Sequence, residues 1–266
     1  MPENRRALPL SLPLSLPLSY GQNFLTSRGY IRKLIGYTDI SPQDTVLEIG
    51  PGKGHITKEL LPKCGRLIAV EADKKLFARL SKELEHEKKL DLHQGDFMRF
   101  PLPKEEYKVF ANIPFGLTTA IIRRLVDSKN PPKAWLIVEL GAARRFSQSE
   151  KSLTALSLRP YYRVRIAAKI DRGQFHPRPR VDAALLEIIP REKPDLPRNE
   201  REAWQRFLHQ ALKGGCGLRN LLTKRQIAAA LRQAGSYAQV SNREADSNLR
   251  YVQWLCLFRY WRNLRG

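Results

Sequence analysis

The stretch Thr45-Val46-Leu47-Glu48-Ile49, followed by Gly50-Pro51-Gly52-Lys53-Gly54, decides the fold of this chain. A short apolar run of this kind is typical of a buried strand, and the glycines after it allow a tight turn close to a ligand. A helix is predicted to follow as far as Leu60. Strand, glycine loop and helix in this order predict the first unit of an open α/β sheet, in which ligands bind at the carboxyl ends of the strands.

The sequence on either side of this unit alternates between helices and strands. Before it, Ile31, Leu34 and Ile35 share one face of a helix that Thr26 or Ser27 can cap. After it, strands are predicted at 67–71, 90–93, 107–111, 134–139, 164–170 and 181–189, and helices around 76–84 and 118–127. This alternation predicts a mostly parallel sheet covered on both faces. Only residues 173–180 separate the last two strands, so we expect these to form an antiparallel hairpin at the sheet edge.

Two segments lie outside the α/β region. The prolines Pro9, Pro13 and Pro17 break any helix near the N-terminus, and no small-residue cleavage site follows, so we expect an extended leader rather than a signal peptide. Residues 191–198 are charged and contain prolines, which is typical of a linker. The expected organisation is therefore a Pro/Leu/Ser-rich leader at 1–20, a catalytic domain at 21–190 and a basic helical C-terminal domain at 191–266.

The chain is strongly basic. Its 266 residues include 47 Lys and Arg against 26 Asp and Glu, which gives a formal net charge of +21. Residues 140–266 hold 25 of these basic residues and only 10 of the acidic ones. Such an excess is typical of proteins that bind a polyanion, usually nucleic acid and less often a membrane surface. The alternative is a basic protein without such a partner.

Other classes of protein do not fit the sequence. No apolar run reaches the roughly 18–20 residues of a membrane-spanning helix, so we expect no membrane association. Cys64, Cys216 and Cys256 are far apart and form no CxxC pair, and the five histidines lack metal-ligand spacing. We therefore expect reduced thiols, no metal site and a cytoplasmic protein.

Acidic residues follow the glycine loop at the ends of the next two predicted strands. Glu71 lies where a carboxylate can accept hydrogen bonds from both hydroxyls of a ribose, and Asp96 can accept one from an adenine amino group. The glycine loop lacks the GxGxxG pattern of dinucleotide sites and the GxxxxGK[ST] pattern of P-loops. Together these features predict an adenosine pocket for S-adenosylmethionine rather than for NAD.

The segment Asn112-Ile113-Pro114-Phe115 follows the fourth predicted strand. The exocyclic amine of adenine is a poor nucleophile, because its lone pair is delocalised into the ring. Acceptors for its two hydrogens, the Asn112 side chain and the Ile113 carbonyl held by Pro114, favour a geometry with the lone pair directed outward. Phe115 offers a flat face for an unstacked base. We predict that these four residues form the catalytic site; an ordinary turn is the alternative.

These segments resemble the ribosomal RNA adenine N6-methyltransferases and, within that superfamily, the erythromycin-resistance (Erm) enzymes. The resemblance extends from about Tyr20 to the C-terminus, and residues 22–27, 46–54, 71, 95–97, 112–115 and 175–182 carry it. It implies a Rossmann-like class I methyltransferase domain with a small helical C-terminal domain that binds RNA. It also implies methylation of N6 of one adenine in protein-free or precursor 23S rRNA, and resistance to macrolides, lincosamides and streptogramin B. We expect a monomer by default.

The resemblance also implies roles for individual residues. Gly50 would approach the methionine part of the cofactor, Glu71 its ribose and Asp96 its adenine, while Phe115 would stack on the target base. The cofactor set it implies is Gln22, Asn23, Leu25, Gly50, Gly52, Gly54, Glu71, Asp96 and Asn112. The arginines that we expect to contact RNA phosphates are Arg144, Arg145, Arg163, Arg165, Arg178 and Arg180.

Three alternatives share parts of this pattern. The small-subunit rRNA dimethyladenosine transferases have nearly every motif, but residues 110–119, 222–226 and 249–258 resemble the Erm branch more closely. A non-catalytic nucleic-acid-binding protein, such as mitochondrial transcription factor B, can keep the fold without the chemistry; the intact Asn112 and Glu71 argue against it. DNA adenine methyltransferases typically carry a second proline where Ile113 stands.

Overall fold

The structure, a computed structural model, describes residues 23–147, 152–213, 217–235 and 250–265. The predicted leader and Gln22 therefore lie outside the described residues. The centre is a seven-stranded sheet in the order β4-β3-β2-β5-β6-β9-β7. Its strands are β2 (Thr45–Ile49), β3 (Arg66–Glu71), β4 (Leu90–Gln94), β5 (Lys108–Asn112), β6 (Lys133–Glu139), β7 (Tyr162–Ile170) and β9 (Ala183–Pro190).

The direction of the strands confirms the predicted α/β fold. Strands β4, β3, β2, β5 and β6 are parallel, whereas β9 runs antiparallel to both β6 and β7. The last two strands thus form the expected antiparallel pair at one edge of the sheet. β9 begins at Ala183, so Val181 and Asp182, which we expected inside the strand, precede it.

Alternating side chains along the strands bury both faces of the sheet. On β2, Val46 packs with α1 (Arg28–Ile35) and α2 (His55–Leu60), and Leu47 packs on the opposite face with α4 (Thr118–Val126). Ser27 caps α1, since its Oγ accepts a hydrogen bond from the Tyr30 N–H at 3.3 Å. The other helical elements before β9 are α3 (Lys74–Glu83), η1 (Phe115–Leu117), α5 (Leu140–Ser147), α6 (Leu153–Leu158) and η2 (Arg172–Gln174).

Helices follow the sheet after Pro190. They are η3 (Arg198–Glu200), α7 (Arg201–Ala211), η4 (Leu218–Asn220), α8 (Lys224–Gly235) and α9 (Tyr251–Asn263). Aromatic side chains join α7 to α9, with the Trp204 and Phe258 rings 5.2 Å apart, edge to face. The Trp204 Nε1–H donates to the Leu156 carbonyl of α6 at 2.9 Å, and one apolar cluster runs from the sheet into α7 and α9. No described helix is long and apolar enough to cross a membrane.

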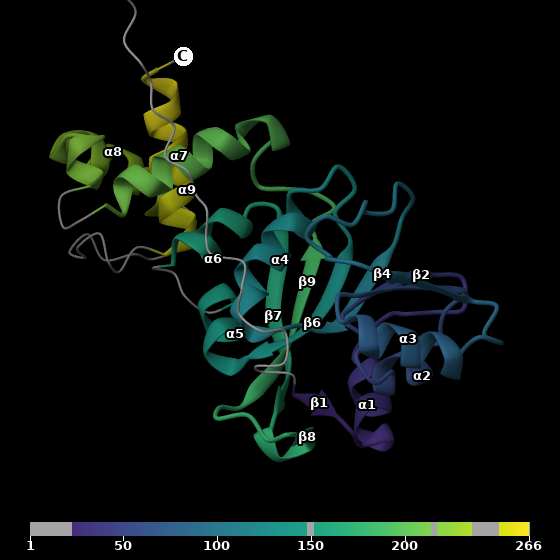
Figure 1. Cartoon of the computed structure of the whole chain (residues 1–266). Helices are drawn as coiled ribbons and strands as arrows, with labels where there is room; N and C mark the ends of the chain where they lie inside the picture. The colour runs from purple at the N-terminus through teal and green to yellow at the C-terminus, as the bar shows by residue number, and fades with distance from the viewer. Residues whose placement is uncertain (1–22, 148–151, 214–216, 236–249, 266) are drawn as a thin grey trace, which may run out of the picture.

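Two short strands lie across the carboxyl end of the sheet. β1 (Phe24–Leu25) pairs antiparallel with β8 (Phe175–His176). Figure 1 shows this pair at one end of the sheet and α7, α8 and α9 gathered at the other. We expected residues 173–180 only as a connection, because a strand of two residues has no periodicity that a sequence pattern can reveal. The pairing holds the N-terminal segment near the ends of β2 and β5.

A substitution of Gly54 tests the conformation of the loop that connects β2 to α2. Its φ is +75°, and a Cβ there would lie 2.4 Å from Leu80 Cδ1. We expect Gly54→Ala to destabilise the fold by more than about 1 kcal/mol, because a left-handed alanine alone costs about that much. Urea unfolding measures the change.

Gly29→Ala is the matched control for this substitution. Gly29 lies in α1 and has an ordinary φ, and a Cβ at this position would have no described atom within 4 Å. Alanine there should stabilise the helix by about 0.5–1 kcal/mol. Equal effects of the two substitutions would contradict the assigned role of Gly54.

Candidate active site

The predicted cofactor residues lie at the ends of four neighbouring strands. β2 ends at Ile49, β3 at Glu71, β4 at Gln94 and β5 at Asn112. Because these strands are parallel and adjacent, their carboxyl ends form one edge of the sheet. The structure thus brings together the glycine loop 50–54, Glu71, Asp96 and Asn112, which are far apart in the sequence.

The three glycines of the loop face different surroundings. Gly50, Gly52 and Gly54 have φ values of +66°, +60° and +75°. A Cβ on Gly52 would lie 2.5 Å from the Phe24 ring, and Gly54 is packed against Leu80 in the same way. In contrast, no described atom lies within 4 Å of a Cβ built on Gly50. The protein itself fills the space at Gly52 and Gly54, whereas a ligand can approach the backbone at Gly50.

The Glu71 side chain accepts a hydrogen bond from the glycine loop 50–54. This side chain is 4% exposed. Oε2 accepts a hydrogen bond from the Gly52 N–H and Oε1 one from the Asp73 N–H, both at 2.8 Å. A carboxylate has about four lone-pair positions, so each oxygen can accept a further hydrogen bond, as a ribose diol requires.

The end of β4 supplies the second carboxylate. Asp96 is exposed, and its Oδ1 accepts a hydrogen bond from the Met98 N–H at 2.8 Å. Gly95 precedes it, and a Cβ on Gly95 would have no described atom within 4 Å. Two carboxylates beside open backbone at Gly50 and Gly95 fit the adenosine part of S-adenosylmethionine.

The Asn112 side chain is oriented by the N-terminal segment. Its Nδ2–H donates to the backbone carbonyl of Asn23 at 2.7 Å. Asn23 directly precedes β1, so the β1–β8 pair holds this carbonyl in place. The hydrogen bond uses the donor side of the amide and leaves Oδ1 as the acceptor for a ligand. The sequence pattern identified Asn112 and Asn23, but only the pairing of β1 with β8 explains their contact.

The residues after Asn112 are held in a fixed turn. The Ile113 N–H donates to the Ile137 carbonyl at 3.3 Å, and the Ile113 side chain is buried. Pro114, with φ −57° and ψ 125°, leads into η1. Phe115 is half-buried against the apolar cluster of α1 and α2, and its carbonyl accepts a hydrogen bond from Thr118 Oγ1 at 2.9 Å. Leu25 is buried in the same cluster, so it can meet a ligand only through its backbone.

Glu48, in the middle of β2, is a buried carboxyl that sequence reasoning did not single out. It is 1% exposed, and its Oε2 has no hydrogen-bond partner among the described residues. Burial raises the pKa of Glu48 to about 8; the Thr57 hydroxyl opposes this shift and the Glu71 carboxylate adds to it. Glu48 is therefore mostly protonated at neutral pH, which leaves Glu71 without a second buried negative charge beside it.

The predicted RNA-contacting arginines lie on different faces of the sheet. Arg144 and Arg145 are exposed on α5, whose buried side chains pack on the face that carries α4. Arg165 belongs to the opposite face, where its Nε and Nη2 donate to the two Glu187 oxygens, each at 2.6 Å. Arg163 lies 4.0 Å from the same carboxylate. Arg178 and Arg180 are exposed in the segment before β9.

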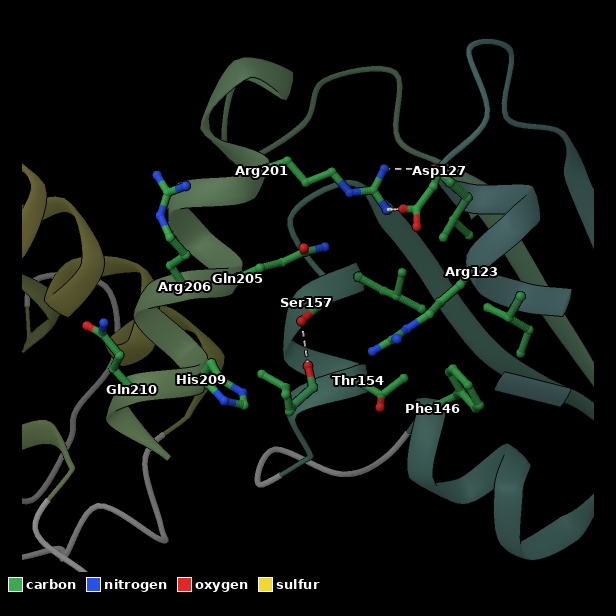
Figure 2. A pocket seen from close by; sticks show the side chains of 14 residues that line it. Arg123, Asp127, Phe146, Thr154, Ser157, Arg201, Gln205, Arg206, His209 and Gln210 are labelled. Carbon is green, nitrogen blue, oxygen red and sulfur yellow. Dashed lines mark hydrogen bonds and ion pairs between the residues drawn. The ribbon is translucent and has the colours of Figure 1, made fainter. Parts of the chain in front are cut away.

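A cleft of about 430 Å³ lies between α4, α5, α6 and α7. Figure 2 shows Arg123 of α4 pointing toward Thr154 and Ser157 of α6, with His209 on α7 across the cleft and Arg206 on the outer side of the same helix. Arg201 closes one end through an ion pair with Asp127. This cleft has no signal in the sequence, because its residues come from four separate helices.

Comparisons with known proteins find extensive similarity. The family described as "Ribosomal RNA adenine dimethylase" matches residues 15–262. A protein of Lysinibacillus sphaericus named rRNA adenine N-6-methyltransferase is 32% identical and covers 92% of this chain and 96% of its own length. A protein of the same name from Limosilactobacillus reuteri is also 32% identical, over 89% of this chain and 93% of its own length.

Solved structures are similar over the same span. The crystal structure of the 23S rRNA methyltransferase ErmE superposes with a TM-score of 0.79 at 27% identity, over 90% of this chain and 100% of that one. A dimethyladenosine transferase from Plasmodium falciparum has a TM-score of 0.70 at 22% identity, over 88% and 95% of the two chains. At 22% identity, the comparison with the Plasmodium falciparum protein shows similarity of fold only.

The raised pKa of Glu48 predicts how stability depends on pH. The carboxyl ionises near 4.5 in the unfolded chain but only near pH 8 in the folded one. Between these values unfolding releases a proton, so the free energy of unfolding falls as pH rises and levels off above about pH 8. Urea unfolding at pH 5.5, 7 and 8.5 should show Glu48→Gln gaining stability relative to the wild type at each step.

The exposed Glu105 provides the control for this series. Glu105→Gln removes a carboxylate that is not subject to a burial penalty. The difference in stability between this variant and the wild type should stay constant over the same pH range. If the difference in unfolding free energy between Glu48→Gln and wild type also stays constant with pH, Glu48 is not a buried neutral acid.

Proposed function

This chain belongs to the ribosomal RNA adenine dimethylase family and is an S-adenosylmethionine-dependent rRNA adenine N6-methyltransferase; we propose that its substrate is one adenine of 23S rRNA. The relatives named rRNA adenine N-6-methyltransferase and the overall similarity to ErmE support this choice. The small-subunit dimethyladenosine transferase is the less favoured alternative. Methylation of 23S rRNA would confer resistance to macrolides, lincosamides and streptogramin B.

The contact between Asn112 and Asn23 carries the proposal. It places an amide oxygen, with its orientation fixed, at the edge of the sheet where Gly50 leaves the backbone open and Glu71 offers acceptors. Methylation of an exocyclic amine needs such an acceptor beside the methyl donor. Glu71 would bind the ribose, Asp96 the adenine and the backbone at Gly50 the methionine part of S-adenosylmethionine.

The residues of the turn would position the target base. Asn112 Oδ1 and the Ile113 carbonyl would accept the two hydrogens of the N6 amine, which directs the nitrogen lone pair toward the methyl donor. Phe115 would stack on the adenine, and the hydrogen bond from Thr118 to its carbonyl fixes the backbone that carries the ring. When bound, S-adenosylmethionine supplies a methyl group on a positively charged sulfur that needs no acid to leave. The two oxygens would also stabilise the positive charge that develops on N6 before its proton passes to solvent.

We place the main RNA-binding surface on the face of the sheet that carries α4, α5 and α6. Arg144 and Arg145 are exposed there, and the cleft of Figure 2 adds Arg123 and Arg206. Arg123 lies five residues beyond the start of α4, which is about 7.5 Å along the helix axis from Thr118. An RNA strand that leaves the methylation site could therefore reach the cleft within a few nucleotides. Arg165, held by Glu187, would serve the fold rather than the RNA.

The substrate is tested by methyl transfer from labelled S-adenosylmethionine. Protein-free 23S rRNA, 16S rRNA and assembled 30S particles are offered in parallel, and the labelled nucleotide is then mapped. We expect label at one adenine of 23S rRNA. Label on 16S rRNA or on 30S particles would identify the small-subunit enzyme instead.

Substitutions of Asn112 test the proposed mechanism of methyl transfer. We expect Asn112→Ala to lower methyl transfer by roughly a hundredfold or more, the usual effect of removing one positioned polar group. Asn112→Asp should be similarly impaired, because a carboxylate cannot donate to the Asn23 carbonyl. Calorimetry should show nearly unchanged affinity for S-adenosylmethionine.

Asn130→Ala is the matched control. Its Nδ2–H also donates to a backbone carbonyl, that of Glu105, but at the opposite end of β5. The Asn130→Ala variant should keep wild-type turnover. Wild-type turnover in Asn112→Ala would overturn the proposed mechanism.

Removing arginines from the cleft should weaken the salt dependence of RNA affinity. The double variant Arg123→Ala/Arg206→Ala should bind the RNA more weakly and lower the slope of log affinity against log salt by about one unit for each lost phosphate contact. Arg66→Ala, an exposed arginine paired with Asp91 outside this cleft, is the control. Filter binding between 50 and 300 mM salt gives the slopes; identical slopes for all three proteins would remove the cleft from the RNA-binding surface.

A further inference from the structure

Two exposed apolar side chains lie at the carboxyl edge of the sheet. The exposed large apolar residues of the described chain are Tyr37, Leu117, Val181, Val252 and Leu264. Leu117 is 46% exposed and ends η1, five residues after Asn112. Val181 is 44% exposed and lies two residues before the start of β9. Scattered apolar residues are common on protein surfaces, so it is the position of these two that needs an explanation.

The register of the sheet places Leu117 and Val181 on either side of the end of β6, and Leu117 follows the strand that ends at Asn112. Asn112 at the end of β5 pairs with Ile137 of β6, and Glu139 at the end of β6 pairs with Ala183 of β9. Leu117 and Val181 therefore extend from strand ends separated only by β6. Two strand spacings correspond to about 10 Å between these ends.

Hydrogen bonds hold the backbone at or next to both residues. The Leu117 N–H donates to the Pro114 carbonyl at 2.9 Å, which closes the turn around Phe115. Next to Val181, the Asp182 carbonyl accepts a hydrogen bond from the Leu140 N–H at 2.9 Å. The Asp182 side chain also accepts one from the Arg172 N–H at 3.1 Å. These hydrogen bonds fix the backbone from which the two side chains project.

A methyltransferase that acts on a base edge needs that base out of its stack. Moving a base out costs a few kcal/mol in lost stacking and leaves a gap between its neighbours. Apolar side chains that enter such gaps replace part of the lost contact. Leu117 and Val181 have the required apolar chemistry, and Leu117 belongs to the same short helix η1 as Phe115. The exposed Arg178 and Arg180, close to Val181 in the sequence, carry the charge that an adjacent phosphate would need.

We propose that Leu117 and Val181 form a wedge that enters the RNA base stack where the target adenine leaves it and keeps that adenine against Phe115. This inference rests on the proposed function, because it requires an RNA adenine as the substrate. The wedge assists the extrusion of the base and leaves the binding of S-adenosylmethionine unaffected.

The test compares Leu117→Ala/Val181→Ala with wild type on two RNA fragments that contain the mapped adenine. In the first fragment the neighbours of the adenine are intact, and in the second they are replaced by abasic sugars, so that no stack has to be opened. We expect kcat/KM to fall roughly tenfold on the first fragment and to stay within about twofold of wild type on the second. Affinity for S-adenosylmethionine, from calorimetry, should not change.

A fluorescent base reports extrusion directly. With 2-aminopurine in place of the target adenine, wild type should raise the fluorescence as the base leaves the stack, and the double variant should fail to do so. Leu117→Met, which keeps an apolar side chain of similar volume, should restore most of the activity when combined with wild-type Val181. The control Tyr37→Ala removes another exposed apolar side chain, just after α1 and outside every segment to which we assign RNA contacts, and should behave as wild type.

Two results would overturn the wedge. Wild-type kcat/KM in the double variant on the intact fragment would show that the two side chains do not contribute. An equal loss on both fragments would show a general structural defect rather than help in opening the stack. If the wild-type enzyme methylates no 23S rRNA fragment at all, the proposed function fails and the wedge fails with it.

Discussion

The buried Glu71 carboxylate connects the parts of the proposed cofactor site. It accepts hydrogen bonds from the N–H groups of Gly52 and Asp73, and so joins the glycine loop to the start of α3. Hydrogen bonds to a charged acceptor are stronger than those between neutral groups, especially away from solvent. The nearby Glu48 is compatible with this charge only because burial keeps it protonated near neutral pH. The two buried carboxyl groups thus have different surroundings: Glu71 accepts two backbone hydrogen bonds, whereas burial raises the pKa of Glu48.

The two ends of the sheet serve different purposes. At the amino end of β5, Lys108 is paired with Asp44 at 2.9 Å and with Asp39 at 3.0 Å. Lys133 also pairs with Asp39, at 2.6 Å, so the charges there neutralise one another. At the carboxyl end, Glu71, Asp96 and Asn112 keep acceptor capacity toward open space. This asymmetry follows from the parallel arrangement, because loops at the carboxyl ends can vary without disturbing the strand registers. Stability is concentrated at one end and chemistry at the other.

The sequence predicted the sheet well and marked the strand ends at which the proposed cofactor residues lie, because these signals are local. Apolar runs and the glycine loop marked each strand and its end, and Ser27 capped α1 as the pattern suggested. The two-residue strands β1 and β8 were missed, since so short a segment has no period. The arginines were predicted from charge alone, which says nothing about partners: Arg165 is held by Glu187, a residue 22 positions away.

The sequence by itself determined the order of strands and helices, the glycine turn and the residue types at the strand ends, because these depend on neighbours along the chain. Only the tertiary structure decided which of these residues meet. It set the Asn112 amide on the Asn23 carbonyl, separated by 89 positions, and divided the arginines between the two faces of the sheet. It also placed Leu117 and Val181 on either side of the end of β6. Such contacts depend on strand order and register, which are fixed by how the two faces of the sheet are buried rather than by any local pattern.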